Sequence, residues 1–168
     1  MFSVGDKVVY KTDSVCIVES IETPAFVKDK EKKYYKLKSL FSKGNEVAYV
    51  PVDSEVSVRA VITCIEAEKY IAELKNLEPA DIDLNKPALI ASSFQDKLCD
   101  CTVEAMLKVM KFVLVREKSL EKTGKKIRQV EERYLAIVEK VLSEEFALAL
   151  GKEPDEIKAL LRQNAVCD

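Results

Sequence analysis

The chain has 168 residues, of which 48% are hydrophobic and 33% are charged, and its formal net charge is −2. This composition is that of a folded protein with a sizeable core, and it argues against disorder and low-complexity sequence. No apolar run approaches the roughly 18 residues that a membrane span needs, and the N-terminus has no basic segment followed by an apolar one. We therefore expect one or two domains in the cytoplasm, without a signal peptide or a membrane partner.

The first 60 residues have the pattern of short β-strands. Turn residues separate five runs that are rich in β-branched and aromatic side chains, a spacing that is typical of small, strongly curved sheets. Gly44-Asn45 lies between two of these runs and indicates a hairpin, whereas Pro24 should end its strand or lie at an edge. The sequence therefore predicts a small SH3-like or Tudor-like barrel at residues 1–60. The predicted strands are Lys7–Tyr10, Val15–Ile21, Lys33–Leu40, Glu46–Val50 and Val56–Val61.

From residue 61 onward the apolar residues recur with the period of an α-helix. Asp100 or Thr102 is placed to cap the third helix, Gly151 to end the fourth, and Pro154 to occupy the first turn of the last. The sequence thus predicts an α+β protein in which the barrel is followed by a bundle of about five helices at 61–168. The predicted helical stripes run over Ala67–Leu77, Ala88–Leu98, Val103–Leu114, Ile127–Leu148 and Ile157–Leu161.

Several stretches resemble one protein family. The opening Val4-Gly5-Asp6-Lys7-Val8-Val9-Tyr10, the segment Ile21-Glu22-Thr23 and the later Val47–Asp53 are similar to the CarD family of bacterial transcription regulators. The same module occurs in the transcription-repair coupling factor. In the helical part, Arg116-Glu117 followed by Thr123-Gly124-Lys125-Lys126 is similar to that family's link between its long helices. The resemblance implies a Tudor-like domain that binds RNA polymerase, followed by a helical domain on DNA.

The resemblance also implies where the polymerase would bind. In the CarD family the module engages the β subunit of RNA polymerase by strand addition, for which a sheet edge offers unpaired backbone groups. We expect the matching surface at the end of the second strand and along the fourth. The alternative for Tyr49 is that its ring merely covers the barrel. The predicted polymerase-binding residues are Glu22, Thr23, Pro24, Val47, Ala48, Tyr49 and Val50.

The distribution of charge indicates where DNA phosphates would be contacted. Residues 108–128 carry eight basic and two acidic side chains, whereas the flanking stretches 61–107 and 129–168 have net charges of −5 and −4. Such a basic island can meet phosphate in a slightly acidic protein because salt screens charges beyond about 8–10 Å. The alternative is a solvated helix face with i,i+4 ion pairs. The predicted DNA-contacting residues are Lys86, Lys97, Lys108, Lys111, Lys122, Lys125, Lys126 and Arg128.

CarD relatives also place a Trp wedge and an arginine cluster against the promoter, consistent with how apolar wedges stabilise distorted DNA. The corresponding stretch here, Lys86–Phe94, has neither feature, and the chain contains no Trp. We therefore expect DNA binding, if it occurs, to be weak and insensitive to sequence, through phosphate contacts.

Enzymatic chemistry has little support in the sequence. The chain has no His and its four glycines are scattered, so a common general base and a phosphate-cradling loop are both missing. Cys99-Asp100-Cys101 is the one suggestive spacing, but zinc usually takes four ligands, and the five cysteines are expected to be free thiols in a reducing compartment. We expect a non-enzymatic protein without metal or cofactor, and the sequence favours no oligomeric state.

Three functions follow in order of preference. The first is a transcription regulator that binds RNA polymerase through its barrel and modulates the stability of the promoter open complex. The second is a protein-interaction module that keeps polymerase binding without DNA binding. The third is a thiol protein built on Cys99 and Cys101.

Overall fold

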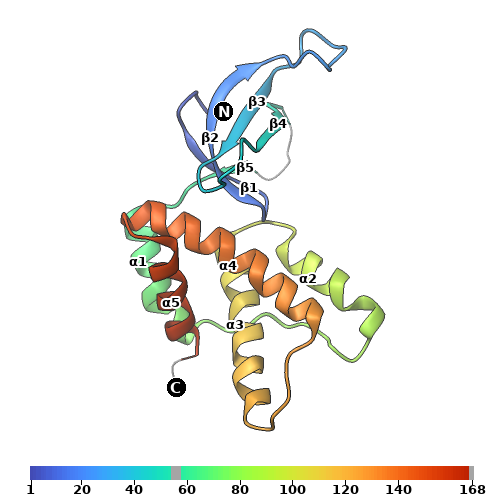
Figure 1. Cartoon of the computed structure of the whole chain (residues 1–168), viewed down its shortest axis with the longest axis vertical. Helices are drawn as coiled ribbons and strands as arrows, with labels where there is room; N and C mark the ends of the chain where they lie inside the picture. Colours follow the sequence, from blue (N-terminus) through green and yellow to red (C-terminus); the bar gives the residue numbers. More distant parts are fainter. Residues whose placement is uncertain (54–57, 167–168) are drawn as a thin grey trace. The chain divides into compact units, whose positions relative to one another are not determined.

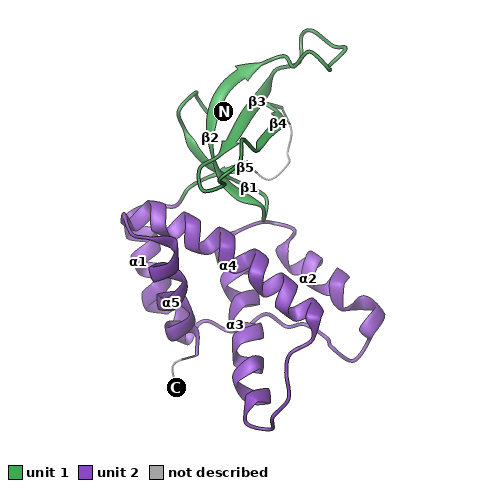
Figure 2. Ribbon diagram, in the orientation of Figure 1, with its two compact units in different colours: residues 1–61 green, residues 62–168 purple. Residues whose placement is uncertain are grey.

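The computed structural model describes residues 1–53 and 58–166, and the chain divides into two compact units, Met1–Val61 and Ile62–Asp168 (Figure 2). Strands make up the first unit and helices make up the second, so the predicted α+β class is confirmed (Figure 1). None of the described helices is long and apolar enough to cross a membrane.

Unit 1 is an antiparallel sheet with the strand order β4-β3-β2-β1-β5. The edge strands β4 and β5 have five and three residues, and no ladder joins them within the described residues. The sheet is therefore not closed, which corrects the predicted barrel. Val56 and Ser57, which begin the predicted fifth strand, lie outside the described residues. The strands are β1 (Lys7–Tyr10), β2 (Ser14–Glu22), β3 (Tyr34–Ser39), β4 (Val47–Pro51) and β5 (Val58–Ala60).

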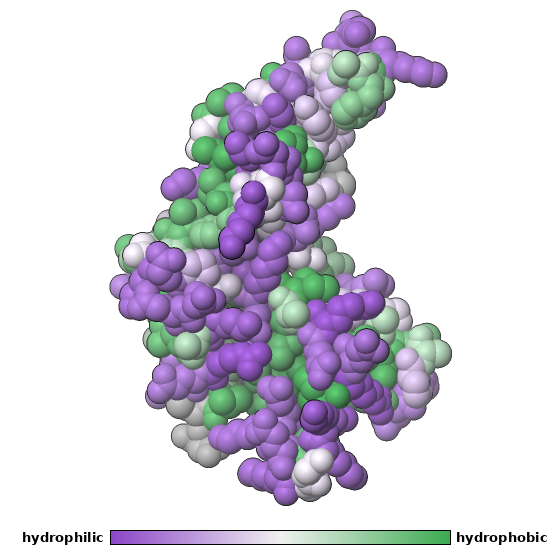
Figure 3. Space-filling model, viewed as in Figure 1, coloured by the Kyte–Doolittle hydropathy of each residue, from purple (hydrophilic) through white to green (hydrophobic). Residues whose placement is uncertain are grey.

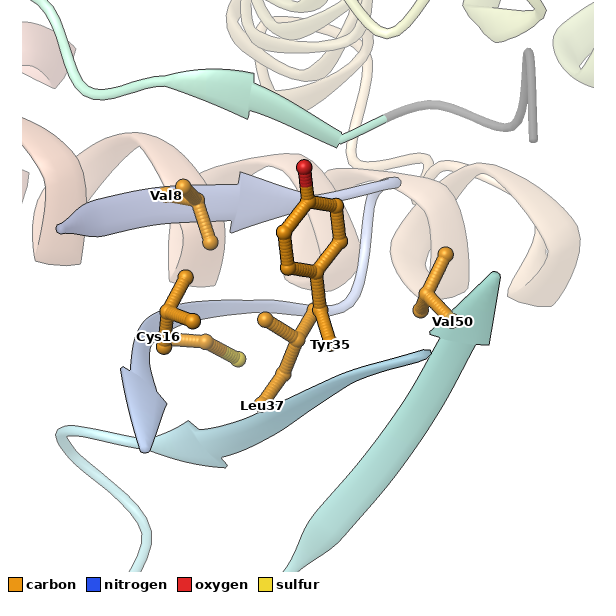
Figure 4. Close-up of a cluster of buried hydrophobic side chains, with 6 residues drawn as sticks. Val8, Cys16, Tyr35, Leu37 and Val50 are labelled. Atoms are coloured by element: carbon orange, nitrogen blue, oxygen red, sulfur yellow. The ribbon is translucent and has the colours of Figure 1, made fainter. Parts of the chain in front are cut away.

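The core of unit 1 lies on one face of this sheet. Six buried side chains converge there (Figure 4), since alternate residues of a strand point to the same face. The Tyr35 hydroxyl accepts a hydrogen bond from the Phe2 amide at 2.9 Å. A register shift between Val18 and Ser20 resets the alternation along β2, so that Ile21 returns to the core side. The core residues are Val8, Cys16, Val18, Tyr35, Leu37 and Val50.

Local signals in the sequence set the ends of the helices in unit 2. The Thr102 hydroxyl accepts a hydrogen bond from the Ala105 amide at 3.2 Å and caps α3. Gly151 ends α4 in the left-handed region, with φ of 65°, and Pro154 opens α5. The helices are α1 (Cys64–Glu73), η1 (Leu74–Asn76), η2 (Pro87–Leu89), α2 (Ile90–Leu98), α3 (Val103–Glu121), α4 (Gln129–Leu150) and α5 (Pro154–Ala165).

The core of unit 2 contains both aromatic stacks and buried charge. Phe94 of α2 is fully buried and stacks on Tyr134 of α4, with 4.7 Å between ring centroids and an interplanar angle of 5°. Glu131 of α4 is also fully buried, and its carboxylate accepts hydrogen bonds from Arg116 Nε at 2.7 Å and from the Arg128 amide at 2.9 Å. A buried carboxylate is tolerated where such partners offset its lost hydration.

Candidate functional site

The β4 edge presents backbone groups in a regular order. The Val52 amide donates to the Lys33 carbonyl at 3.0 Å and the Ser39 amide donates to the Glu46 carbonyl at 3.3 Å. Since bonded and non-bonded pairs alternate along an antiparallel ladder, the amides of Ala48 and Val50 point toward β3. The amides and carbonyls of Val47 and Tyr49 therefore point away from the sheet, and no strand pairs with that side among the described residues.

An aromatic pair lies beside this edge. The rings of Phe26 and Tyr49 meet edge to face with centroids 5.4 Å apart, although Phe26 is 71% exposed. The Tyr49 hydroxyl donates to Glu22 Oε1 at 3.3 Å, which ties the ring to the end of β2. Val47 is 39% exposed and adds aliphatic surface to the same strand. The edge thus combines free backbone groups with an apolar, hydrogen-bonded side-chain surface.

The loop between β2 and β3 holds Phe26 in place. Thr23 donates through its hydroxyl to the carbonyls of Lys30 and Lys32 at 3.3 and 2.9 Å, which closes the loop on itself. Pro24 is buried, and its carbonyl accepts from the Val27 amide at 3.0 Å. Thr23 and Pro24, which were predicted to contact polymerase, therefore have hydrogen-bond partners within the loop that carries Phe26.

The structure brings Glu22 and Tyr49 together, as expected for a single surface, whereas the side chains of Ala48 and Val50 face the core of unit 1. Phe26 was missed by sequence reasoning. The signal in the sequence was a lone Phe inside a lysine-rich loop, which belongs to no strand or helix period.

The basic island does not form one free surface. Lys111 is buried, and its ammonium group donates to the carbonyls of Leu74 and Lys75 at 2.9 and 2.7 Å. Two backbone acceptors hold this charge inside the protein, so Lys111 is not available to DNA and its prediction as a DNA-contacting residue is wrong. Lys118, which lies in the same island, donates to the Val166 carbonyl at 2.9 Å.

Other members of the island also have partners within the chain. Lys108 pairs with Glu104 at 2.6 Å, one turn earlier on α3. Arg116 binds the buried Glu131, and Arg128 donates to the Leu84 carbonyl at 2.8 Å. The Arg116 contact joins α3 to α4 and the Arg128 contact holds a loop, whereas the Lys108 pair lies within α3. All three contacts reduce the availability of these basic side chains to phosphate.

Three lysines of the island remain exposed around one turn. Lys122 follows α3, and Lys125 and Lys126 lie on the far side of Gly124, whose φ is 69°. The same turn carries Glu121, so its charge is not purely basic. Lys86 precedes η2 and Lys97 lies in the last turn of α2, both exposed and on elements other than this turn.

The two adjacent cysteines differ in environment. Cys101 is buried and its thiol donates to the Leu98 carbonyl at 3.4 Å, whereas Cys99 is exposed and donates to Asp100 Oδ1 at 3.5 Å. This hydrogen bond, together with desolvation and the neighbouring negative charge, raises the pKa of the Cys99 thiol. Cys167 lies outside the described residues.

An open sheet edge beside the exposed Phe26 ring defines unit 1 as a small β domain that is suited to binding another polypeptide. Residues 2–62 match the CarD-like/TRCF RID domain, and comparison with curated proteins gives no match. The N-terminal part of the chain therefore carries a CarD-like/TRCF RID domain. This RNA polymerase-interacting domain supports polymerase binding and a role related to transcription.

Proposed function

We propose that the chain is a non-enzymatic transcription regulator that binds the β subunit of RNA polymerase by adding a strand of that subunit to β4. The observation that carries the proposal is the outward direction of the Val47 and Tyr49 backbone groups, on a side of β4 that no other strand of residues 1–53 and 58–166 pairs with. A partner strand would restore a ladder there, with about 0.5–1.5 kcal/mol for each hydrogen bond formed. Because the edge lies within the matched domain, the proposal and the family agree on the same part of the chain.

The side chains at this edge favour an apolar contact. The exposed Phe26 packs against the half-buried Tyr49, and covering such rings removes large apolar areas from water. The outer face of the sheet next to them carries Lys36 in an ion pair with Glu19 at 2.7 Å. We propose that the aromatic pair supplies affinity and that the backbone ladder sets register and strand direction.

For unit 2 we propose contact with promoter DNA through phosphates at the turn that carries Lys122, Lys125 and Lys126, and an effect on open-complex stability. Their exposure supports this role, and phosphate contacts of this kind carry no sequence information. Replacing all three with Glu should abolish binding of duplex DNA in an electrophoretic mobility assay at about 50 mM salt, where such contacts are strongest. Retention of tight binding by the triple variant would assign DNA contact to another surface.

A second function is favoured by a specific observation. Lys108, Lys111, Arg116, Lys118 and Arg128 all have partners within the chain. A helical unit that uses its basic side chains internally is suited to holding other proteins rather than DNA. The chain would then be a protein-interaction module that binds polymerase without binding DNA, and equal mobility of DNA with and without wild-type protein would support this reading.

The polymerase proposal is tested by biolayer interferometry of the full chain on immobilised RNA polymerase and on the isolated β subunit. Val47→Pro removes one outward amide and leaves the β3–β4 ladder intact, because proline is tolerated at the start of an edge strand. We expect binding to weaken about fivefold to tenfold, as one ladder hydrogen bond is lost.

The matched control is Ala60→Pro. The Val61 amide donates to the Lys7 carbonyl at 3.4 Å, so alternation directs the Ala60 amide outward from β5, at the opposite edge of the same sheet. This variant should bind polymerase like the wild type. Equal affinity of the folded Val47→Pro variant and the wild type, or equal losses in both proline variants, would contradict strand addition at β4.

A further inference from the structure

One face of α3 is covered by a loop instead of another helix. The groove at this face has two walls, α3 and the segment 79–85. The α3 wall consists of residues that recur at helical spacing, namely Phe112, Val115, Arg116, Ser119 and Leu120. The groove has a volume of about 630 Å³, which is within the range of roughly 300–1,000 Å³ seen for binding pockets. It lies wholly within unit 2, and neither the family match nor the proposed function assigns it a role.

The walls of this α3 groove are held in place. The Ala80 amide donates to the Lys108 carbonyl at 3.0 Å, and Arg128 holds the Leu84 carbonyl at the other end of the segment at 2.8 Å. Asp83 accepts from the Asn85 amide at 2.9 Å, which fixes the local turn. The groove is therefore a formed feature of the fold, with both ends of its loop wall anchored.

The floor of the groove is apolar and open to solvent. Val115 is 43% exposed. The Phe112 ring packs edge to face against the buried Phe94, with 6.2 Å between the ring centroids. Figure 3 shows hydrophobic residues lying among hydrophilic ones on the visible face of the helical unit. An exposed aliphatic residue in the lining of a formed groove is typical of a surface that another molecule covers.

The rim of the groove is acidic. Asp81 and Asp83 are exposed, and neither has an ion-pair partner within residues 1–53 and 58–166. Arg116 also lines the groove, but its Nε is bound to the buried Glu131, and Arg128 is bound to a carbonyl. The charged residues that line the groove are two aspartates and one arginine, which leaves one negative charge in excess. This excess repels phosphate and attracts basic side chains.

We propose that the α3 groove binds a peptide segment of another protein in which an apolar side chain lies next to Lys or Arg. The apolar side chain would cover Val115 and Leu120, and the basic one would pair with Asp81 or Asp83. This is helix-face recognition with an acidic rim, in which the buried apolar contact supplies affinity and the rim charge supplies selectivity.

The test is nitrogen–proton correlation NMR of the full chain, titrated with a 12-residue peptide of repeated Leu-Lys-Lys. Amide shifts should map to 79–85 and 112–120. A Leu-Glu-Glu peptide and a Ser-Lys-Lys peptide should each bind at least about fivefold more weakly, because one loses the charge match and the other the apolar contact.

Variants assign the effect to the groove. Val115→Glu should weaken Leu-Lys-Lys binding about tenfold or more, and the pair Asp81→Asn and Asp83→Asn about threefold to tenfold, as expected for a buried contact and for two rim charges. Asn at 83 keeps the oxygen that accepts from Asn85. The matched controls are Ile65→Glu, since Ile65 is 79% exposed on α1, and Asp96→Asn on α2, and both should bind like the wild type.

Four results would overturn the proposal. They are absence of saturable binding at millimolar peptide, equal binding of the Leu-Glu-Glu peptide, unchanged affinity of Val115→Glu, and shifts that map elsewhere. If the peptide fails to bind, groove shifts produced by a DNA duplex, or by raising the concentration of the protein alone, would assign the groove to DNA or to a second copy of the chain.

Discussion

Arg116 should be a main determinant of the stability of the helical unit. Its guanidinium is the charged partner of Glu131, whose side chain is 0% exposed. Arg116→Ala would remove the charged donor and leave the buried carboxylate with the hydrogen bond from the Arg128 amide. Breaking a buried pair in this way costs about 3–5 kcal/mol. Because the Arg116 side chain is itself 32% exposed, water reaches part of the site and we expect about 3 kcal/mol.

The assay is thermal and urea unfolding of the full chain followed by circular dichroism at 222 nm, which reports mainly on the helices. For a unit of this size, about 3 kcal/mol lowers Tm by about 10–20 °C. Adding Glu131→Gln to Arg116→Ala removes the stranded charge while keeping an acceptor for the Arg128 amide, so it should recover much of the loss.

The exposed Lys122→Ala serves as the control and should change stability by less than about 0.5 kcal/mol. An Arg116→Ala variant as stable as this control would refute the view that the pair offsets the burial of Glu131. A double variant no more stable than Arg116→Ala would show that lost packing of the arginine stem, and not the unpaired carboxylate, causes the destabilisation.

Three further outcomes are expected. Cys99 should react slowly with iodoacetamide at pH 7, because its raised pKa leaves little thiolate, and Asp100→Asn should speed the reaction several-fold; equal rates would contradict the hydrogen-bond assignment. Thr63→Ala should cost about 1 kcal/mol at pH 7 by removing the cap of α1. Hydrogen bonds from the amide and hydroxyl of Thr63 lower the pKa of Glu66. The ionised Glu66 therefore stabilises the fold at pH values above its unfolded pKa. In urea melts, this contribution to the free energy of unfolding should be lost as the pH falls through the folded pKa. Gly151→Ala should cost about 1 kcal/mol in the same melts because φ there is 65° and no packing would compensate.

Much of the fold could be predicted from local signals. Thr102, Gly151 and Pro154 act at helix ends as their side chains and backbone preferences require. The alternation in β3 follows the core face, whereas β1 and the start of β2 have consecutive buried residues. Closure of the sheet could not be predicted in this way, because it depends on whether β4 and β5 meet, and that is a property of pairing between distant segments.

The candidate sites show the same division. Glu22 and Tyr49 were placed on one surface because family resemblance supplied the pairing that local pattern lacks. Lys111 was misjudged because the carbonyls that bind it belong to residues 74 and 75, far away in the sequence. Phe26 was overlooked because its significance depends on the Tyr49 ring across the loop. Long-range partners, not residue types, decide these cases.

The central claim is strand addition at β4, and hydrogen–deuterium exchange of the full chain with and without RNA polymerase tests it most directly. The amides of Val47 and Tyr49 point away from the sheet, so they should exchange quickly in the free protein and become protected when polymerase is bound. The Ala48 and Val50 amides face β3 and should be protected in both states, which provides an internal reference. Unchanged exchange at Val47 and Tyr49 in a saturated complex would contradict the account.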